Sequence, residues 1–214
     1  AVLRYSGWGG LSINRVRSQV PQDLDDAGQL LWLPDAAGLL HEYYTPSRLC
    51  QEVARVVQPL LAELAAEDGI VRALEPSAGI GRFPSALSGA GFERLRWTLV
   101  EYSPLSARIL AALFPAADLY APMPFERFIS EHEQEVAGSL SLVVSNPPYG
   151  ERLLTPAQCS RIHQALGAMC HHNDLKSYII TSSDRFEEEF GKKADRRRKL
   201  YNGMIKCDAF MYGR

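Results

Sequence analysis

The sequence predicts an α/β domain with a doubly wound, mostly parallel sheet that ends in an antiparallel pair. Short apolar runs alternate with helical patterns along most of the chain, an order typical of parallel strands joined by crossover helices. One run, at 140–144, is apolar except for a single serine, as expected of a strand that is buried on both faces. Near the end, Asn202-Gly203 separates two strand-like runs, and this dipeptide is a strong signal for a tight hairpin.

Each element follows from the spacing of apolar residues and from the residues that start or stop it. The helix after Thr45 has the clearest pattern, because its apolar residues from Leu49 to Leu64 recur at helical spacing. Thr45 is a suitable N-cap for this helix, and Pro46 is a suitable first residue. The other predicted helices lie at 104–114, 125–136, 155–169 and 184–190. The predicted strands lie at 71–74, 96–100, 118–120, 140–144 and 176–181, followed by a hairpin at 198–212.

Composition and charge narrow the class of protein. The 214 residues, 46% apolar and 22% charged, are typical of one ordinary globular domain. The net charge of −2 excludes a global basic field, so any contact with nucleic acid must come from local patches. The four cysteines include no CxxC pair, which argues against zinc and favours reduced thiols. No apolar run approaches the ~20 residues of a membrane span. We therefore predict a cytoplasmic protein with no metal and no membrane contact, composed of an N-terminal extension at 1–40 and a domain at 41–214.

The loop Asn146-Pro147-Pro148-Tyr149 directly follows the apolar run at 140–144. Two prolines end the strand, and the carboxyl ends of parallel strands are where open α/β sheets bind ligands. The Asn146 side-chain oxygen and the Pro147 carbonyl can accept two hydrogen bonds from one planar NH2 group, and Tyr149 offers a ring for stacking. Two such acceptors would favour the pyramidal, nucleophilic form of an aromatic amine. A simple turn after a strand is the alternative, since turns are rich in Asn and Pro.

A second motif follows the first predicted strand, where Glu75 precedes a glycine turn that leads into a helix. Glycines allow the backbone to approach a ligand closely. A dinucleotide fingerprint would require a third glycine where this chain has Pro84, which argues against a nicotinamide or flavin enzyme. An acid followed by Gly-x-Gly better suits an ammonium group beside an adenosine. The candidate residues of this turn are Glu75, Pro76, Ser77, Ala78, Gly79 and Gly81.

The second predicted strand ends in Glu101, about 26 residues after the first strand. A carboxylate at this position suits hydrogen bonds to ribose hydroxyls, although a solvated carboxylate is an equal alternative. Phe125 and Glu126 follow the weak third strand, in the loop where contacts with an adenine would be expected. A basic run from Lys192 to Lys199 precedes the hairpin, and it indicates either a solvated face or a grip on phosphates.

Together, these motifs resemble those of the S-adenosylmethionine-dependent amino-methyltransferases, which methylate an exocyclic nitrogen of a nucleobase. The resemblance covers nearly the whole chain and follows the permuted motif order of the gamma-type adenine methylases. It implies a class I methyltransferase (Rossmann-like) fold with a seven-stranded sheet containing one antiparallel strand. The matching residues are Tyr44-Thr45-Pro46, Glu75-Pro76-Ser77-Ala78-Gly79-Ile80-Gly81, Glu101 and Asn146-Pro147-Pro148-Tyr149.

The resemblance also implies a role for each motif, with S-adenosylmethionine as the cofactor. Tyr44-Thr45-Pro46 would hold the methionine end, and the glycine turn after Glu75 would line the amino acid and the sugar. Glu101 would hold the ribose, and Phe125 or Glu126 would lie by the adenine. The catalytic loop Asn146-Pro147-Pro148-Tyr149 would hold the target base.

Two halves of the chain resemble different branches of these enzymes. Residues 1–150 resemble the N6-adenine DNA methylase modules of large methylase–helicase proteins, whereas residues 146–214 resemble ribosomal-RNA guanine-N2 methyltransferases. We expect adenine N6 in DNA as the target, because the longer half favours it. A guanine-N2 methyltransferase acting on ribosomal RNA is one alternative, and a non-catalytic cofactor-binding module of a methylase–helicase is another. The expected partners are nucleic acid, DNA rather than RNA, and a helicase or target-recognition domain outside this chain.

Overall fold

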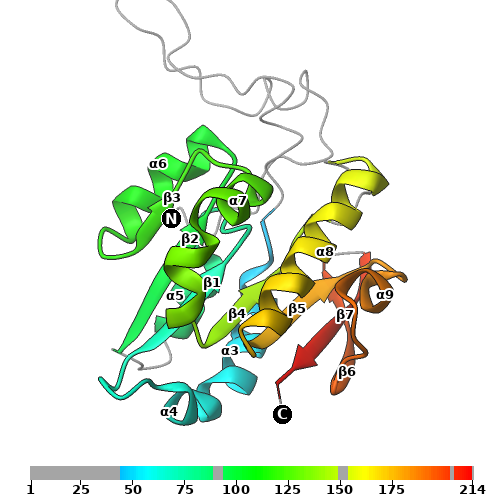
Figure 1. The fold of residues 1–214 in the computed structure, drawn as a ribbon, viewed down its shortest axis with the longest axis horizontal. Coiled ribbons are helices and arrows are strands. Elements are labelled where there is room, and N and C mark those ends of the chain that lie inside the picture. Colours follow the sequence, from blue (N-terminus) through cyan, green and yellow to red (C-terminus); the bar gives the residue numbers. More distant parts are fainter. Residues whose placement is uncertain (1–43, 89–93, 149–153, 203–204, 214) are drawn as a thin grey trace, which may run out of the picture.

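The computed structural model describes residues 44–88, 94–148, 154–202 and 205–213, and its centre is a seven-stranded sheet (Figure 1). The strand order is β3-β2-β1-β4-β5-β7-β6, in which neighbours from β3 to β5 are parallel. Only β7 is reversed, because it pairs antiparallel with both β5 and β6. The predicted sheet with one antiparallel strand is therefore confirmed. The strands are β1 (Val71–Glu75), β2 (Leu95–Val100), β3 (Asp118–Tyr120), β4 (Leu142–Ser145), β5 (Lys176–Thr181), β6 (Arg196–Asn202) and β7 (Ile205–Tyr212).

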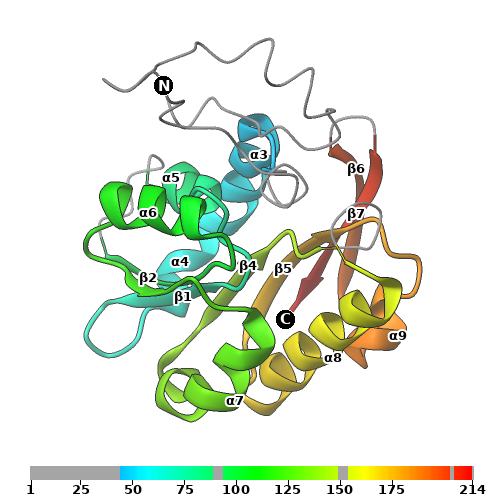
Figure 2. The same ribbon diagram turned by 90° about the horizontal axis from the view of Figure 1, so that it is seen from above.

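Helices cover both faces of the sheet in three layers, as Figure 2 shows. One core lies under α3, α5 and α6, and a second lies under α7, α8 and α9. Along β4, Leu142 and Val144 enter the first core while Val143 enters the second, which explains the continuous apolar pattern of this strand. The helices are α3 (Ser47–Val57), α4 (Leu61–Leu64), α5 (Arg82–Ser88), α6 (Pro104–Leu113), α7 (Phe125–Val136), α8 (Pro156–His172) and α9 (Phe186–Phe190), with 3-10 turns at Gln58–Leu60 and Ala137–Ser139.

The long helix predicted from Pro46 to Leu64 is wrong in two respects. It is broken into α3, a 3-10 turn and α4, because Pro59 in the turn lacks the N–H that a continuous helix needs. It also begins at Ser47, and no side chain caps it. The Pro46 carbonyl instead accepts the first hydrogen bonds, from the N–H groups of Leu49 and Cys50. The Thr45 hydroxyl is thereby left for a different partner, described below.

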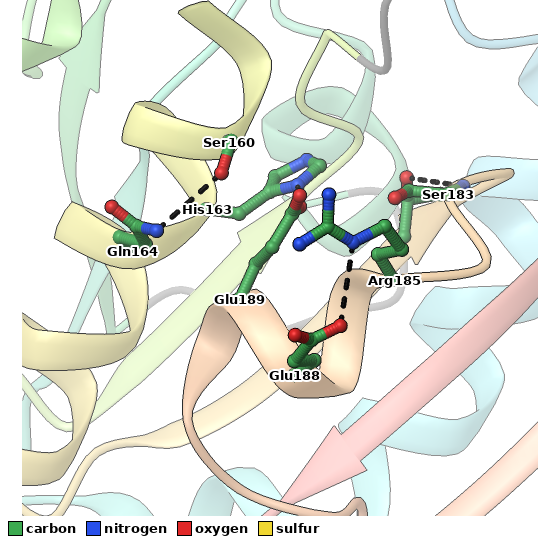
Figure 3. A network of polar contacts seen from close by, with 8 residues as sticks. Ser160, His163, Gln164, Ser183, Arg185, Glu188 and Glu189 are labelled. Carbon is green, nitrogen blue, oxygen red and sulfur yellow. Dashed lines mark hydrogen bonds and ion pairs between the residues drawn. The ribbon is translucent and has the colours of Figure 1, made fainter. Parts of the chain in front are cut away.

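One polar contact and one close backbone approach join α8 to α9 outside the sheet, and Figure 3 shows the region of the polar contact. His163 of α8 is fully buried, and its Nδ1 lies 2.7 Å from the Glu189 carboxylate of α9. A Cβ atom at Gly167 would lie 2.1 Å from the Phe190 carbonyl oxygen, so only glycine allows this approach of the helices. These contacts explain His163 as a structural residue of this layer. No helix within the described ranges is long and apolar enough to cross a membrane.

Candidate active site

Three predicted site residues meet at the carboxyl edge of the sheet. Glu75 ends β1, Glu101 follows β2, and Asn146 follows β4. The strand order reverses between β1 and β4, and the carboxyl ends of the strands at such a reversal are where open α/β sheets bind ligands. Tyr44 and Thr45 reach the same edge from the segment before α3. The sequence therefore predicted correctly which loops converge.

The Asn146 side chain is held by Thr45, although 101 positions separate the two residues. The Asn146 Nδ2 donates to the Thr45 Oγ1 at 2.9 Å. The Asn146 Oδ1 is buried and has no hydrogen-bond partner among the described residues. Because the nitrogen is already engaged, the amide is oriented with its oxygen available as an acceptor. Pro147 is buried beside it and Pro148 is half-buried, while Tyr149 lies outside the described residues.

Two carboxylates, those of Glu75 and Glu101, lie at the ends of β1 and β2. Glu75 is 3% exposed, and its Oε2 has no hydrogen-bond partner in the described part of the chain. Burial, and secondarily the charge of Glu101, raise the pKa of Glu75 well above its usual range. Burial also raises the pKa of Glu101 to about 7, although backbone N–H groups oppose this shift. A buried carboxylate oxygen without a partner is costly when the acid is ionised, so Glu75 is suited to a cationic ligand.

Glu101 organises the loops around it. Its two carboxylate oxygens accept hydrogen bonds from the N–H groups of Gly79 and Ser103, each at 2.6 Å. A carboxylate has about four acceptor positions, so both oxygens keep capacity for ribose hydroxyls. The Glu101 backbone also accepts from the Met123 N–H at 2.8 Å, which brings the loop after β3 to the site. Glu101 is therefore a positioned group rather than the solvated carboxylate of the alternative prediction.

The glycine turn is packed against the protein itself. Gly79 and Gly81 have φ values of +56° and +77°, which residues other than glycine rarely adopt. A Cβ atom at Gly79 would lie 2.9 Å from the Tyr44 ring, and one at Gly81 would lie 2.2 Å from the Phe114 ring. The Tyr44 hydroxyl is in turn 2.9 Å from the Ser106 hydroxyl of α6. The glycines therefore let Tyr44 and α6 close over the turn, a packing role that the sequence did not predict.

The remaining predicted residues are placed differently from one another. Pro76 and Ala78 are buried and Ser77 is half-buried within the turn. Phe125 is 5% exposed and stacks on Phe128 in the second core, and Glu126 is exposed on the first turn of α7. Contact of either residue with an adenine stays a prediction.

Two residues near the site were missed from sequence. Tyr102 follows Glu101 directly, and 58% of its surface is exposed. Its position directly after Glu101, the acid that follows β2, was the available signal. Arg82 is 7% exposed, and its guanidinium donates to the Ser47 Oγ at 2.9 Å, which ties α5 to the start of α3. Nothing in the spacing of the sequence indicates this contact. Within the described ranges, no group of three His, Cys, Asp or Glu side chains is arranged to hold a metal.

Comparison with known proteins finds similarity to methyltransferases. Residues 127–210 match the model of the RMKL-like methyltransferase domain family. YpsC of Bacillus subtilis strain 168, a protein carrying the name of an RNA methyltransferase, is 42% identical over 72 residues, which are 33% of this chain and 19% of that protein. The ribosomal RNA large subunit methyltransferase K/L of Syntrophotalea carbinolica is 30% identical over 218 residues, covering 97% of this chain and 28% of that protein. The chain thus spans less than a third of the length of either relative.

A solved structure extends the comparison to the fold. The crystal structure of SMU.472, named as a methyltransferase and complexed with SAH, superposes with a TM-score of 0.56 at 20% sequence identity. The match covers 81% of this chain and 55% of that chain. The predicted class I methyltransferase fold is confirmed, and S-adenosylmethionine stays the predicted cofactor. The residues present fit this group, because the unpartnered Glu75 oxygen suits its ammonium and Glu101 keeps acceptor positions for its ribose.

Proposed function

We propose that this domain transfers a methyl group from S-adenosylmethionine to an exocyclic amino group of a nucleobase in RNA, with guanine N2 of ribosomal RNA as the preferred target. The curated relatives described above are named as RNA methyltransferases, and one of them is named for ribosomal RNA of the large subunit. These names support RNA over the DNA target expected from the longer half of the sequence. Adenine N6 in DNA stays a second candidate, because residues 1–150 resemble the DNA methylase modules.

The Asn146 amide carries the proposal for the reaction type. Its oxygen is the available acceptor, because Thr45 engages its nitrogen at 2.9 Å. Together with the Pro147 carbonyl, this oxygen can accept both hydrogens of one NH2 group. Accepting both hydrogens localises the nitrogen lone pair, which is otherwise delocalised into the base, and so makes the amine nucleophilic without a strong base.

The two carboxylates serve the other substrate. When bound, S-adenosylmethionine supplies an electrophilic methyl group on a sulfonium. Glu75 would accept from its ammonium, and Glu101 would accept from its ribose hydroxyls. Because the backbone N–H groups of Gly79 and Ser103 already hold Glu101, the site needs little reorganisation on binding. A target base in a duplex must first leave its stack, at a cost of about a few kcal/mol.

The test of this function is methyl transfer from labelled S-adenosylmethionine to ribosomal RNA and to DNA in parallel, with digestion to nucleosides and mass spectrometry. We expect N2-methylguanine in the RNA. N6-methyladenine in the DNA would replace RNA by DNA as the substrate and reinstate the second candidate. If neither nucleic acid gained label while the cofactor still bound, the chain would be a cofactor-binding module and the proposal would be wrong.

Thr45→Val should lower methyl transfer about 10- to 100-fold, because the Asn146 amide loses the partner that fixes its orientation. Thr45→Ser keeps an acceptor oxygen and should retain most of the activity. Separate measurement of kcat and of the dissociation constant for the cofactor distinguishes this role from the predicted contact with the methionine end. A fall in cofactor affinity with kcat unchanged would show that Thr45 serves the cofactor and not Asn146.

A further inference from the structure

The hairpin formed by β6 and β7 extends beyond the sheet at the edge where Asn146 lies. The last pair between β5 and β7 joins Thr181 to Asp208. Past this pair, β6 and β7 continue alone through the pairs Leu200–Cys207, Tyr201–Lys206 and Asn202–Ile205. At about 3.3 Å per residue, the hairpin projects on the order of 10 Å past the end of β5. In Figure 1 it ends on the same side of the molecule as the start of α8.

One face of this projecting end carries two lysines and a tyrosine. Tyr201 and Lys206 are directly paired across the two strands, and Lys199 lies two residues before Tyr201, so all three side chains share a face. Tyr201 is 69% exposed, and both lysines are exposed. Neither lysine forms an ion pair with a described residue. Asp208, which is opposite Lys199, is already bound to Arg197 at 2.6 Å.

Protection of an edge strand accounts for only part of this pattern. Lysines on an edge strand commonly prevent pairing with other chains. An exposed tyrosine between them works against that purpose, because it adds a large apolar surface to the same edge. An aromatic ring flanked by unpaired cations is instead the combination that binds single-stranded nucleic acid, with a base stacked on the ring and phosphates on the ammonium groups. Because the net charge of the chain is −2, its overall charge does not attract a polyanion, and binding would depend on a local basic patch of this kind.

We propose that Lys199, Tyr201 and Lys206 bind a single-stranded RNA segment a few nucleotides away from the target nucleotide. This inference rests on the proposed function, and it adds the surface that the RNA strand contacts outside the catalytic loop. The register Ser145–Ile179–Phe210–Arg197 places β4 and β6 three strand spacings apart, which is about 14 Å across the sheet. Tyr201 lies four residues beyond Arg197 and Asn146 one residue beyond Ser145, which adds an offset of about 10 Å along the strands. On the order of five stacked nucleotides cover the resulting separation of roughly 17 Å, so a base held by Asn146 and a base stacked on Tyr201 can belong to one short segment.

Binding of a short fluorescent single-stranded RNA, measured by anisotropy over a range of salt concentrations, tests this surface. The double variant K199Q/K206Q should lower the slope of log affinity against log salt by about 1.4, because each lysine neutralises one phosphate. Tyr201→Ala should weaken binding roughly 5- to 100-fold with the slope unchanged, because it removes only stacking. The matched control is R94Q/R96Q, which removes two exposed cations at the opposite edge of the sheet, before and at the start of β2. Thermal unfolding confirms that each variant is folded.

The outcomes separate this inference from the proposed function. If the wild-type chain methylates RNA, and the hairpin variants bind RNA as the control does, the proposed RNA-binding surface is wrong and the proposed function is supported. If the hairpin variants lose affinity for RNA but no substrate is methylated, the RNA-binding surface is supported and the proposed function is wrong. If the wild-type chain shows no affinity for RNA, both are overturned. A change in self-association alone would assign the lysines to edge protection and would also overturn the surface.

Discussion

Replacing Asn146 by alanine should reduce methyl transfer about 100- to 1000-fold while leaving cofactor affinity unchanged. This is the size of effect seen when one preorganised polar group that stabilises a transition state is removed. The Asn146 oxygen has no partner among the described residues, so its loss breaks no internal hydrogen bond through that atom. The nitrogen bond to Thr45 is lost, at a cost of about 1 kcal/mol in stability. Single-turnover transfer and calorimetry of cofactor binding measure the two effects separately.

The control for this variant is Asn173→Ala. Asn173 follows α8, and its side chain donates to the Met169 carbonyl at 2.9 Å, away from the three loops of the site. We expect it to lower stability slightly and to leave the rate unchanged. Wild-type rates in the Asn146 variant would exclude the amide as the group that activates the amine. A parallel loss of cofactor affinity would instead assign Asn146 to the cofactor side.

Much of the fold could be predicted from sequence because its elements have local causes. The strands of a buried parallel sheet are short apolar runs, and the dipeptide Asn202-Gly203 correctly indicated the boundary between β6, which ends at Asn202, and β7, which begins at Ile205. Where the prediction was wrong, at the helix after Thr45, two local signals conflicted. The apolar spacing continued to Leu64, but Pro59 interrupted the backbone hydrogen bonds. A missing N–H outweighs side-chain periodicity, because it removes a hydrogen bond that burial cannot replace.

For the site, too, the sequence predicted what has a local cause and missed what depends on tertiary packing. The positions of Glu75, Glu101 and Asn146 could be predicted from sequence because each lies at the end of a strand or directly after it, and the carboxyl ends of parallel strands share an edge. The contact between Thr45 and Asn146 could not be found, since it joins residues 101 positions apart and depends on how α3 packs. The approach of Tyr44 to Gly79 was hidden for the same reason. Positions follow from local pattern, whereas side-chain partners follow from tertiary packing.

Glu75→Gln should weaken binding of S-adenosylmethionine roughly 10- to 100-fold and, at the same time, stabilise the free domain at high pH. A hydrogen bond to a charged group is lost with the carboxylate, which accounts for the affinity. The stability effect follows from burial, which raises the pKa of Glu75 well above 4.5 in the folded state. A raised acid pKa means that this group stabilises the fold fully below its unfolded pKa of 4.5. That contribution is lost as pH rises toward and through the folded pKa.

Glu101 should add to the same trend, with its loss of stability centred between pH 4.5 and about 7. Thermal unfolding of the free domain across this range should therefore show stability that falls with pH, and less steeply in Glu75→Gln. The control Glu67→Gln removes an exposed carboxylate from the turn after α4 and should leave the pH dependence unchanged.

A cationic ammonium beside Glu75 favours the ionised form of its carboxyl group, so cofactor binding should release protons. Calorimetry in buffers of different ionisation enthalpy measures how many protons are released. If Glu75→Gln released as many protons as the wild type, the ammonium of the cofactor would not lie beside Glu75.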